Sequence, residues 1–397
     1  MENNREVLLK VVLLCQYFRL GHKDMKAVDD VSFEIRKGET FGLVGESGCG
    51  KTTTGRSIIK LYNITSGNVY FKGQRIGAGT RSYKDAIKQA KKDLGEKKIT
   101  KEEYDRIVAE NKALIRDAKL DSKAVDKQYA ESLVKELEAE YAEKFRAAQG
   151  DPEQIKALTK EYRNRVSVAK KSKLITQIQM IFQDPIASLD PRMTVRDIIA
   201  EGLVINGVTD KDYINEKVYE ILETVGLVRE HADRYPHEFS GGQRQRIGIA
   251  RAVVMQPEMI IADEPISALD VSIQAQVINL LNDLREHLGL TILFIAHDLS
   301  VVKYFSDRIG VMYFGKMVEL ADSDELFKNP LHPYTRSLLS AIPLPDPVYE
   351  KQRVRIVYNP IAEHDYSVDA PSFREITPGH FVRCNDAEEA KYREMLQ

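Results

Sequence analysis

The sequence has little cysteine and no tryptophan. Its three cysteines, Cys15, Cys49 and Cys384, are scattered over 397 residues. They cannot form the disulfide framework of a small secreted domain, and they are too few to hold an iron–sulfur cluster by themselves. We therefore expect a reducing compartment, and we expect Cys49 to be a small filler residue without a redox role.

Long apolar runs and an excess of one charge are also missing. No run of about 18 apolar residues occurs, so no transmembrane helix is expected. The apolar stretch 7–14 is interrupted by Lys10 and is too short for a signal peptide with its cleavage site. Charged residues make up 30% of the chain, yet the formal net charge is only −2. No basic field therefore indicates a nucleic-acid partner.

The most specific pattern is a glycine-rich loop between a predicted strand, 39–44, and a predicted helix, 52–61. We call it the phosphate loop; it fits G-x-x-x-x-G-K-[ST] with Gly45, Glu46, Ser47, Gly48, Cys49, Gly50, Lys51 and Thr52. Backbone N–H groups of such a loop converge on phosphate oxygens, aided by the positive end of the helix. Lys51 is expected to reach the β- and γ-phosphates, and the Thr52 hydroxyl to bind Mg²⁺. Thr53 completes the expected nucleotide-binding run.

The segments around this loop predict a small antiparallel sheet. Residues 7–36 form strands and a turn, and 67–73 alternates again,. Tyr17 and Phe18 end the first strand, and either aromatic face is suited to stack on an adenine ring. A place in the core is an equally good interpretation for each of them, and the sequence does not distinguish the two residues.

Residues 78–172 differ in character from the rest, being rich in Lys, Glu, Asp and Ala. Apolar residues recur there at helical spacing in two stripes, formed by Tyr104, Ile107, Val108, Asn111, Leu114 and Ile115, and by Val125, Tyr129, Leu133, Leu137, Tyr141 and Phe145. We predict three or four helices, the longer ones packed as an antiparallel hairpin. One helix, 123–149, would be roughly 40 Å long. The hairpin is expected to project from the core and to be dispensable for ATP binding.

Polar residues follow several predicted strands in the second half of the chain. The strand 174–182 ends at Gln183, the strand 259–262 ends at Asp263 and Glu264, and the strand 291–296 ends at His297. Strands that alternate with helices predict a parallel sheet covered on both faces, with its site at the carboxyl ends of the strands.

These segments together resemble the ATP-binding subunit of an ABC transporter, over about residues 7–76 and 174–325. The marks are the phosphate loop, the Asp263-Glu264 strand end, His297, and the run Ser240-Gly241-Gly242-Gln243 with Ser267-Ala268-Leu269-Asp270 after it. Phe239 stands where this signature usually starts with Leu. The resemblance implies an α/β P-loop ABC-type ATPase with an antiparallel β-subdomain, a helical signature subdomain at about 186–250, and here an inserted helical hairpin.

The predicted domains are an ATPase core with the β-subdomain and phosphate loop (1–77), the helical insertion (78–172), the continued core (173–325) and a C-terminal extension (326–397). The resemblance offers no guide to the insertion. Further motifs look like oligopeptide/dipeptide importer ATPases of the F type: Ala187-Ser188-Leu189-Asp190-Pro191-Arg192, His332-Pro333-Tyr334-Thr335 and Pro378-Gly379-His380.

The resemblance also implies partners. These are a second, related ATPase subunit in a heterodimer, two membrane permease subunits and, indirectly, an extracytoplasmic peptide-binding protein. The expected location is the cytoplasmic face of the cell membrane. Some relatives hold an iron–sulfur cluster in the C-terminal region through several cysteines. Only Cys384 is present here, so no cluster is expected.

Each matched residue has an implied task with ATP and Mg²⁺ as cofactors. Asp263 holds Mg²⁺ through water, beside Thr52. Glu264 is the general base that polarises the attacking water. Gln183 reaches both Mg²⁺ and this water, and His297 contacts the γ-phosphate. Lys51 completes the catalytic set.

The signature helix has an intersubunit role in this family. Its start, formed by Ser240, Gly241, Gly242 and Gln243, is expected to face a γ-phosphate held by the other ATPase subunit, and Asp270 is expected at the same interface. The weaker interpretations are a structural histidine at position 297 and a solvated strand end at 263–264. The combination of motifs makes both less favourable.

Two other classes of ATPase fit the sequence less well. Chromosome-maintenance ATPases interrupt a similar core with a coiled coil, but theirs follows the glutamine that corresponds to Gln183, whereas this insertion precedes it. The insertion also lacks several sustained heptads. Ribosome-associated ATPases carry two cores in one chain, whereas this sequence has one phosphate loop. The sequence therefore favours an ATP-hydrolysing subunit that powers peptide import.

Overall fold

The computed structural model describes residues 5–148, 150–267, 269–342 and 355–396. Within them, the main sheet has eight strands. Their order is β11 (Ser372–Thr377), β12 (His380–Cys384), β10 (Lys316–Asp322), β9 (Arg308–Tyr313), β3 (Thr40–Val44), β8 (Thr291–Ala296), β7 (Met259–Asp263) and β6 (Ile178–Ile181).

The strands from β9 to β6 run parallel to one another. Every residue of β3, β7 and β8 is buried, because a parallel sheet is covered on both faces. Parallel pairing also places the carboxyl ends of these strands at one edge. The phosphate loop, Glu264 and His297 follow those ends directly, and Asp263 is the last residue of β7.

A second sheet forms the predicted antiparallel β-subdomain. Its order is β2 (Lys23–Arg36), β1 (Val7–Leu20), β4 (Ser66–Phe71) and β5 (Gln74–Thr80), and each neighbouring pair is antiparallel. Its apolar face packs with the strands and helix around the phosphate loop in one buried cluster.

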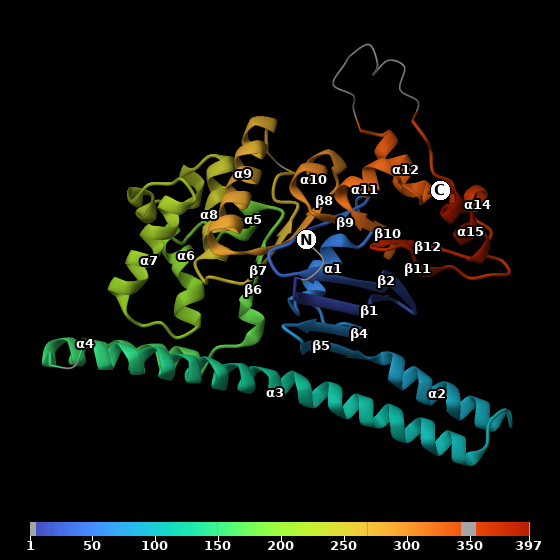
Figure 1. Cartoon of the computed structure of the whole chain (residues 1–397), viewed down its shortest axis with the longest axis horizontal. Coiled ribbons are helices and arrows are strands. Elements are labelled where there is room, and N and C mark those ends of the chain that lie inside the picture. The colour runs from blue at the N-terminus through green and yellow to red at the C-terminus, as the bar shows by residue number, and fades with distance from the viewer. Residues whose placement is uncertain (1–4, 149, 268, 343–354, 397) are drawn as a thin grey trace, which may run out of the picture.

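Helices gather on the side of the main sheet near β6 (Figure 1). They are α5 (Pro185–Ser188), α6 (Val195–Ile205), α7 (Lys211–Thr224), α8 (Gly241–Val253) and α9 (Val271–Leu288), with short 3₁₀ turns at Leu174–Gln177, Arg229–Asp233 and Pro236–Glu238. Thr194 caps α6 and Asp210 caps α7 through their side chains. Helices α5 to α8 fall in the region of about 186–250 where the signature subdomain is predicted, whereas α9 lies beyond it. Helix α10 (Leu299–Phe305) follows β8.

The insertion consists of α2 (Arg81–Gly95), α3 (Lys101–Ala147) and α4 (Pro152–Ala169). Helix α3 is 47 residues long, which corresponds to about 70 Å. Both predicted apolar stripes therefore lie on one continuous helix, and the predicted helix 123–149 is only its second half. Thr100 and Glu103 form the capping box that starts α3.

The insertion is more firmly tied to the core than expected. Val125 and Tyr129, near the middle of α3, are buried in the same cluster as the β-subdomain, and Asp126 accepts a hydrogen bond from the backbone N–H of Leu174 at 3.2 Å. Only farther along do Leu137 and Tyr141 pack against α4. The prediction that the hairpin projects from the core is therefore wrong for the part of α3 around Val125 and Tyr129. The predicted packing of the longer helices is confirmed for α3 and α4.

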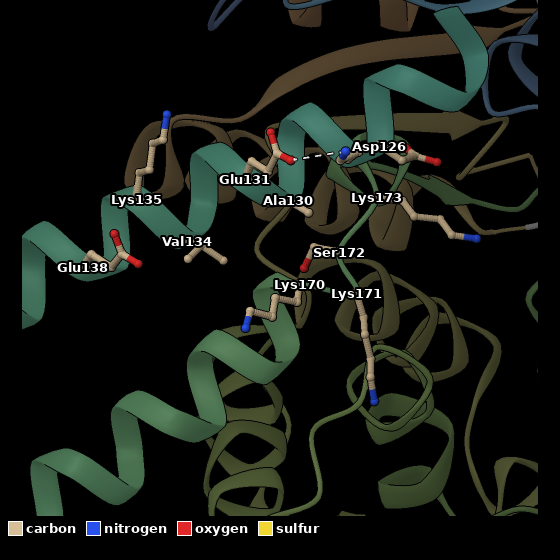
Figure 2. Close-up of a pocket in the computed structure, with 11 residues that line it drawn as sticks. Asp126, Ala130, Glu131, Val134, Lys135, Glu138, Lys170, Lys171, Ser172 and Lys173 are labelled. Carbon is tan, nitrogen blue, oxygen red and sulfur yellow. Dashed lines mark ion pairs between the residues drawn. The ribbon is translucent and has the colours of Figure 1, made fainter. Parts of the chain in front are cut away.

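A groove of about 620 Å³ lies where α3 passes the end of α4 (Figure 2). Its lining combines lysines with carboxylates: Asp126, Lys127, Ala130, Glu131, Val134, Lys135, Glu138, Lys170, Lys171, Ser172 and Lys173. Lys127 and Glu131 form an ion pair of 3.8 Å. None of these residues belongs to the predicted nucleotide site.

The C-terminal region extends the main sheet. Its strand β12 pairs with β10, and Arg383 of β12 donates hydrogen bonds to Met317 O at 3.0 Å and to Asp30 Oδ2 at 3.2 Å. Around it lie α11 (Ser323–Lys328), α12 (Pro333–Ser340), α14 (Pro360–Glu363) and α15 (Asp386–Met395). Among the helices that the structure describes, none is both long and apolar enough to cross a membrane.

Candidate nucleotide site

The phosphate loop joins β3 to α1 (Lys51–Ile58), and its shape requires glycine at two points. Gly45 has a φ of +150°, and a Cβ there would lie 2.2 Å from Met312 O. Gly50 has a φ of +107°, and its Cβ would lie 2.3 Å from Ala27 O. L-residues with a side chain rarely adopt such angles, so the predicted glycines are what allow the loop to curl around a ligand.

Lys51 points back into the loop. Its Nζ donates hydrogen bonds to Gly45 O at 2.7 Å and to Glu46 O at 3.0 Å, and the residue is only 4% exposed. A phosphate oxygen is an anionic acceptor and makes a stronger, charge-assisted bond with the same ammonium. The loop thus presents a buried cation at its centre, as a cradle for phosphate requires.

Asp263 and Thr52 meet across the gap between β7 and α1. Thr52 Oγ1 donates a hydrogen bond to Asp263 Oδ1 at 2.7 Å. Asp263 is fully buried, and its Oδ2 has no hydrogen-bond partner among the described residues, although Arg56 Nη2 lies 3.9 Å away. Burial raises the pKa of Asp263, while Thr52 and Arg56 act in the opposite direction. An orphaned carboxylate oxygen beside a hydroxyl is a donor set that fits Mg²⁺.

Glu264 follows Asp263 in a left-handed backbone conformation, with a φ of +44°. Its carboxylate meets two of the predicted partners. Gln183 Nε2 donates to Glu264 Oε2 at 2.8 Å, and His297 Nδ1 lies 3.5 Å from the same oxygen. The ends of β6, β7 and β8 therefore bring these three side chains together. Two of them, Glu264 and His297, also line a small cleft, whose other lining residues are Ile266, Ser267, Gln274, Ala296, Asp298 and Val301.

The signature residues lie at the start of α8, on the helical side of the molecule. Ser240 Oγ accepts from Gln243 N at 3.3 Å, and Ser240 N donates to Gln243 Oε1 at 3.1 Å, so the two side chains form a capping box. At Gly242 a Cβ would lie 2.7 Å from Ile273 Cγ2, and glycine thus lets α8 approach α9. Asp270 is exposed just before α9.

The structure does not bring the signature residues to this chain's own phosphate loop. No hydrogen bond or ion pair joins Ser240, Gln243 or Asp270 to the loop within the described part of the chain. The intersubunit role predicted for them is compatible with this separation and stays a prediction.

Tyr17 and Phe18 are both partly buried, with different neighbours. The Tyr17 hydroxyl bonds to Asp29, the Lys26 ammonium lies 5.3 Å from its ring centroid, and burial raises the pKa of Tyr17. Phe18 packs edge-on against Tyr62 at 5.2 Å. Since both rings keep part of their surface exposed, both stay candidates for stacking on adenine.

Comparisons with known proteins agree with this geometry. A protein-family model described as ABC transporter matches residues 28–171 and 145–267. The oligopeptide transport ATP-binding protein OppF of Bacillus subtilis is 50% identical over 385 residues, which are 96% of this chain and 98% of that protein. This chain belongs to the ABC transporter family. A model described as the oligopeptide/dipeptide transporter, C-terminal region, also matches residues 318–368.

Further relatives cover the chain of this ABC subunit almost completely. The dipeptide transport ATP-binding protein DppF of Lactococcus lactis is 45% identical over 95% of this chain and 93% of that protein. Alignments of this length include most of the insertion 78–172, so these relatives share it.

Solved structures bear on the fold alone. A subunit of the ABC transporter complex cbiONQ from Clostridium perfringens is 20% identical, with a TM-score of 0.51 over 81% of this chain and 91% of that one. A dimeric ATP-binding cassette in a post-hydrolysis state, bound to ADP and Pi, is 21% identical, with a TM-score of 0.50 over 80% of this chain and 99% of that one. The predicted P-loop ABC ATPase fold is confirmed.

Two residues that touch the site of this ABC subunit received no role from the sequence. Arg56, which faces Asp263, follows Thr52 by four positions on α1, and this i, i+4 spacing is a signal that places both on one helix face. The other is Tyr334, whose hydroxyl accepts a hydrogen bond from the backbone N–H of Glu46 at 3.0 Å. They are 288 residues apart, and no local pattern predicts that contact.

Proposed function

We propose that this ABC subunit hydrolyses ATP to power the import of oligopeptides or dipeptides across the cytoplasmic membrane. The observation that carries the proposal is the near-complete alignment, at 50% identity, with an oligopeptide transport ATP-binding protein. The match of residues 318–368 to an oligopeptide/dipeptide transporter region supports the same substrate class. The chromosome-maintenance alternative has no comparable support.

The chain's own groups suit the binding of ATP with Mg²⁺. Lys51 and the loop N–H groups hold the β- and γ-phosphates, and Thr52 with Asp263 holds Mg²⁺, assisted by Gln183. Mg²⁺, when bound, neutralises charge on the transferred phosphoryl group. Asp263 has an oxygen available for this task, because only Oδ1 is engaged by Thr52.

Hydrolysis requires a base that orients water and accepts its proton. Glu264 Oε2 is held by Gln183 at 2.8 Å and faces His297 at 3.5 Å. In the proposed reaction, Glu264 takes the proton of the attacking water while its neighbours fix the direction of the carboxylate. His297 donates from the strand end to the γ-phosphate.

A complete site is proposed to need a second ATPase subunit. The start of α8 is solvent-facing at Ser240 and Gly241, so another subunit's nucleotide has access to it. We expect a heterodimer with a related ATPase, with the signature residues of each subunit facing the phosphate loop of the other. Two membrane permease subunits would hold this pair at the cytoplasmic face, and an extracytoplasmic protein would deliver the peptide.

Affinity purification of the tagged chain from solubilised membranes tests this assembly. We expect a related ATPase and two permease subunits to co-elute in fixed stoichiometry. The variant Asp270→Arg, which adds a cation at the expected interface, should retain less of the partner ATPase. Recovery of the chain without membrane proteins, or with DNA-associated proteins in their place, would contradict the proposal.

A further inference from the structure

The side chain of Tyr334 joins the C-terminal region to the phosphate loop. Tyr334, in the first turn of α12, is 1% exposed, and its hydroxyl accepts a hydrogen bond from Glu46 N at 3.0 Å. Its ring packs against Tyr313 with centroids 4.4 Å apart. The contact is therefore buried, well packed and directed at the backbone of the nucleotide site.

The contact acts on one peptide unit. The N–H of Glu46 and the carbonyl of Gly45 belong to the same planar trans peptide, so they point in opposite directions. That carbonyl accepts the Lys51 ammonium at 2.7 Å. Because Tyr334 fixes where the N–H points, it also fixes the carbonyl that faces Lys51. A rotation of this peptide would need to break both hydrogen bonds.

Tyr334 is itself held by a buried polar network. Its backbone N–H donates to His332 Nδ1 at 3.1 Å. The N–H groups of Leu331 and His332 donate to the Glu319 carboxylate at 2.8 and 3.1 Å, and His380 Nε2 lies 2.8 Å from Glu319. Since Glu319 lies on β10 of the main sheet, the hydroxyl has a rigid support.

We infer that Tyr334 is a positioning residue for ATP binding, through which the C-terminal region holds the Gly45–Glu46 peptide in the shape that the phosphates require. The inference rests on the proposed function of the phosphate loop. A loop ordered in advance loses less conformational freedom when the nucleotide binds. Loss of one such hydrogen bond is expected to weaken ATP binding by about two- to tenfold.

The variant Tyr334→Phe removes the hydroxyl and keeps the ring. We expect the Kd for ATP of the purified full chain, and the KM for ATP of the assembled transporter, to rise by about two- to tenfold. The kcat should stay within about twofold, because a group that only prepares the loop contributes equally to ground state and transition state. Tyr358→Phe is the matched control, since the Tyr358 ring lies 5.5 Å from Tyr334 in the same cluster; it should change neither constant.

The pattern of the kinetic constants separates positioning from a loss of folded protein. Fewer active molecules lower kcat and leave KM unchanged, so that pattern would overturn the inference, as would an unchanged KM and Kd. A second measurement does not depend on any variant: in the wild-type chain without nucleotide, the Glu46 amide should exchange slowly with solvent. Fast exchange of that amide would also overturn the inference.

Lys51→Ala, measured in parallel, distinguishes this inference from the proposed function. If Lys51→Ala leaves ATP binding intact, the nucleotide site itself is wrong. If Lys51→Ala weakens binding as expected and Tyr334→Phe does not, only the role of Tyr334 is wrong.

Discussion

Gln183 and Glu264, which follow the neighbouring strands β6 and β7, are joined by a 2.8 Å hydrogen bond from Nε2 to Oε2. This hydrogen bond from the Gln183 amide holds the Glu264 carboxylate in one orientation,. His297 lies near the same oxygen. The three side chains thus aim one carboxylate in a defined direction, as proton abstraction from a water molecule requires.

The variant Glu264→Gln should keep ATP binding and lose most turnover in the site that it lines. The amide has nearly the same shape but cannot accept a proton, and removal of a general base costs roughly 10²–10⁴-fold in rate. Steady-state ATPase assays of the assembled transporter measure this. Glu258→Gln is a matched control, because Glu258 pairs with Lys72 at 2.6 Å away from the loop. Near-wild-type turnover from the Glu264→Gln site would rule out the assigned role.

The variant Lys51→Ala should weaken both the binding and the turnover of ATP. Lys51 is the buried cation at the centre of the loop, and no other loop residue supplies that charge. Equilibrium binding of ATP to the purified chain measures the effect, with Lys37→Ala at an exposed position as the control. Equal affinities and activities for the two variants would mean that nucleotide binds elsewhere.

Full ATPase activity should require the partner subunit. Ser240 and Gln243 cap each other at the start of α8 and make no hydrogen bond to the phosphate loop within the described residues. The purified chain alone should therefore hydrolyse ATP far more slowly than the transporter. Comparison of the two rates at equal chain concentration is the measurement, and equal rates would show that the partner is dispensable.

The middle of the insertion should contribute to the stability of the core. Tyr129 is 8% exposed and belongs to the cluster around the phosphate loop, so Tyr129→Ala should cost about 3–5 kcal/mol of unfolding free energy. Leu114, on the same helix, is 41% exposed, and Leu114→Ala should cost about 0.5 kcal/mol or less. Denaturant unfolding compares them. Similar losses for both variants would mean that α3 is not anchored at Tyr129.

Stability should fall in mild acid because of His332. Burial is the main cause that lowers its pKa from 6.5 to about 3, so the folded state favours the neutral ring. The contribution of the neutral His332 ring to the free energy of unfolding is therefore complete above pH 6.5, and it is lost progressively as the pH falls toward 3,. His332→Asn keeps an acceptor for the cap of α12 but cannot titrate. Unfolding measured at about pH 7.5 and about pH 5 should show a larger loss for the wild type; equal losses would contradict this.

Much of the site was predictable because its motifs are local and the sheet is parallel. Asp263, Glu264 and His297 each follow an apolar strand, and parallel strands bring such residues to one edge. Gln183 and the phosphate loop also follow strands of this sheet, so the same rule places them at the same edge.

The remaining contacts depend on packing between segments that are distant in sequence. The spacing of Val125 and Tyr129 predicts a helical face but not the surface that covers it, and that surface proved to be the β-subdomain. The length of α3 could have been predicted from the sequence, because neither glycine nor proline occurs between Thr100 and Gly150 to interrupt a helix,. For Tyr334, no local pattern indicates Glu46 as the partner, because 288 residues separate them.

Peptide uptake by reconstituted vesicles tests the central claim most directly. The chain is assembled with its partner ATPase, the two permease subunits and the peptide-binding protein, and the accumulation of a labelled oligopeptide is followed with ATP on the side of the ATPases. We expect ATP-dependent accumulation that is abolished by Glu264→Gln and unaffected by Glu258→Gln. Accumulation that persists at the wild-type rate with Glu264→Gln, or an intact complex that hydrolyses ATP without moving peptide, would contradict the account.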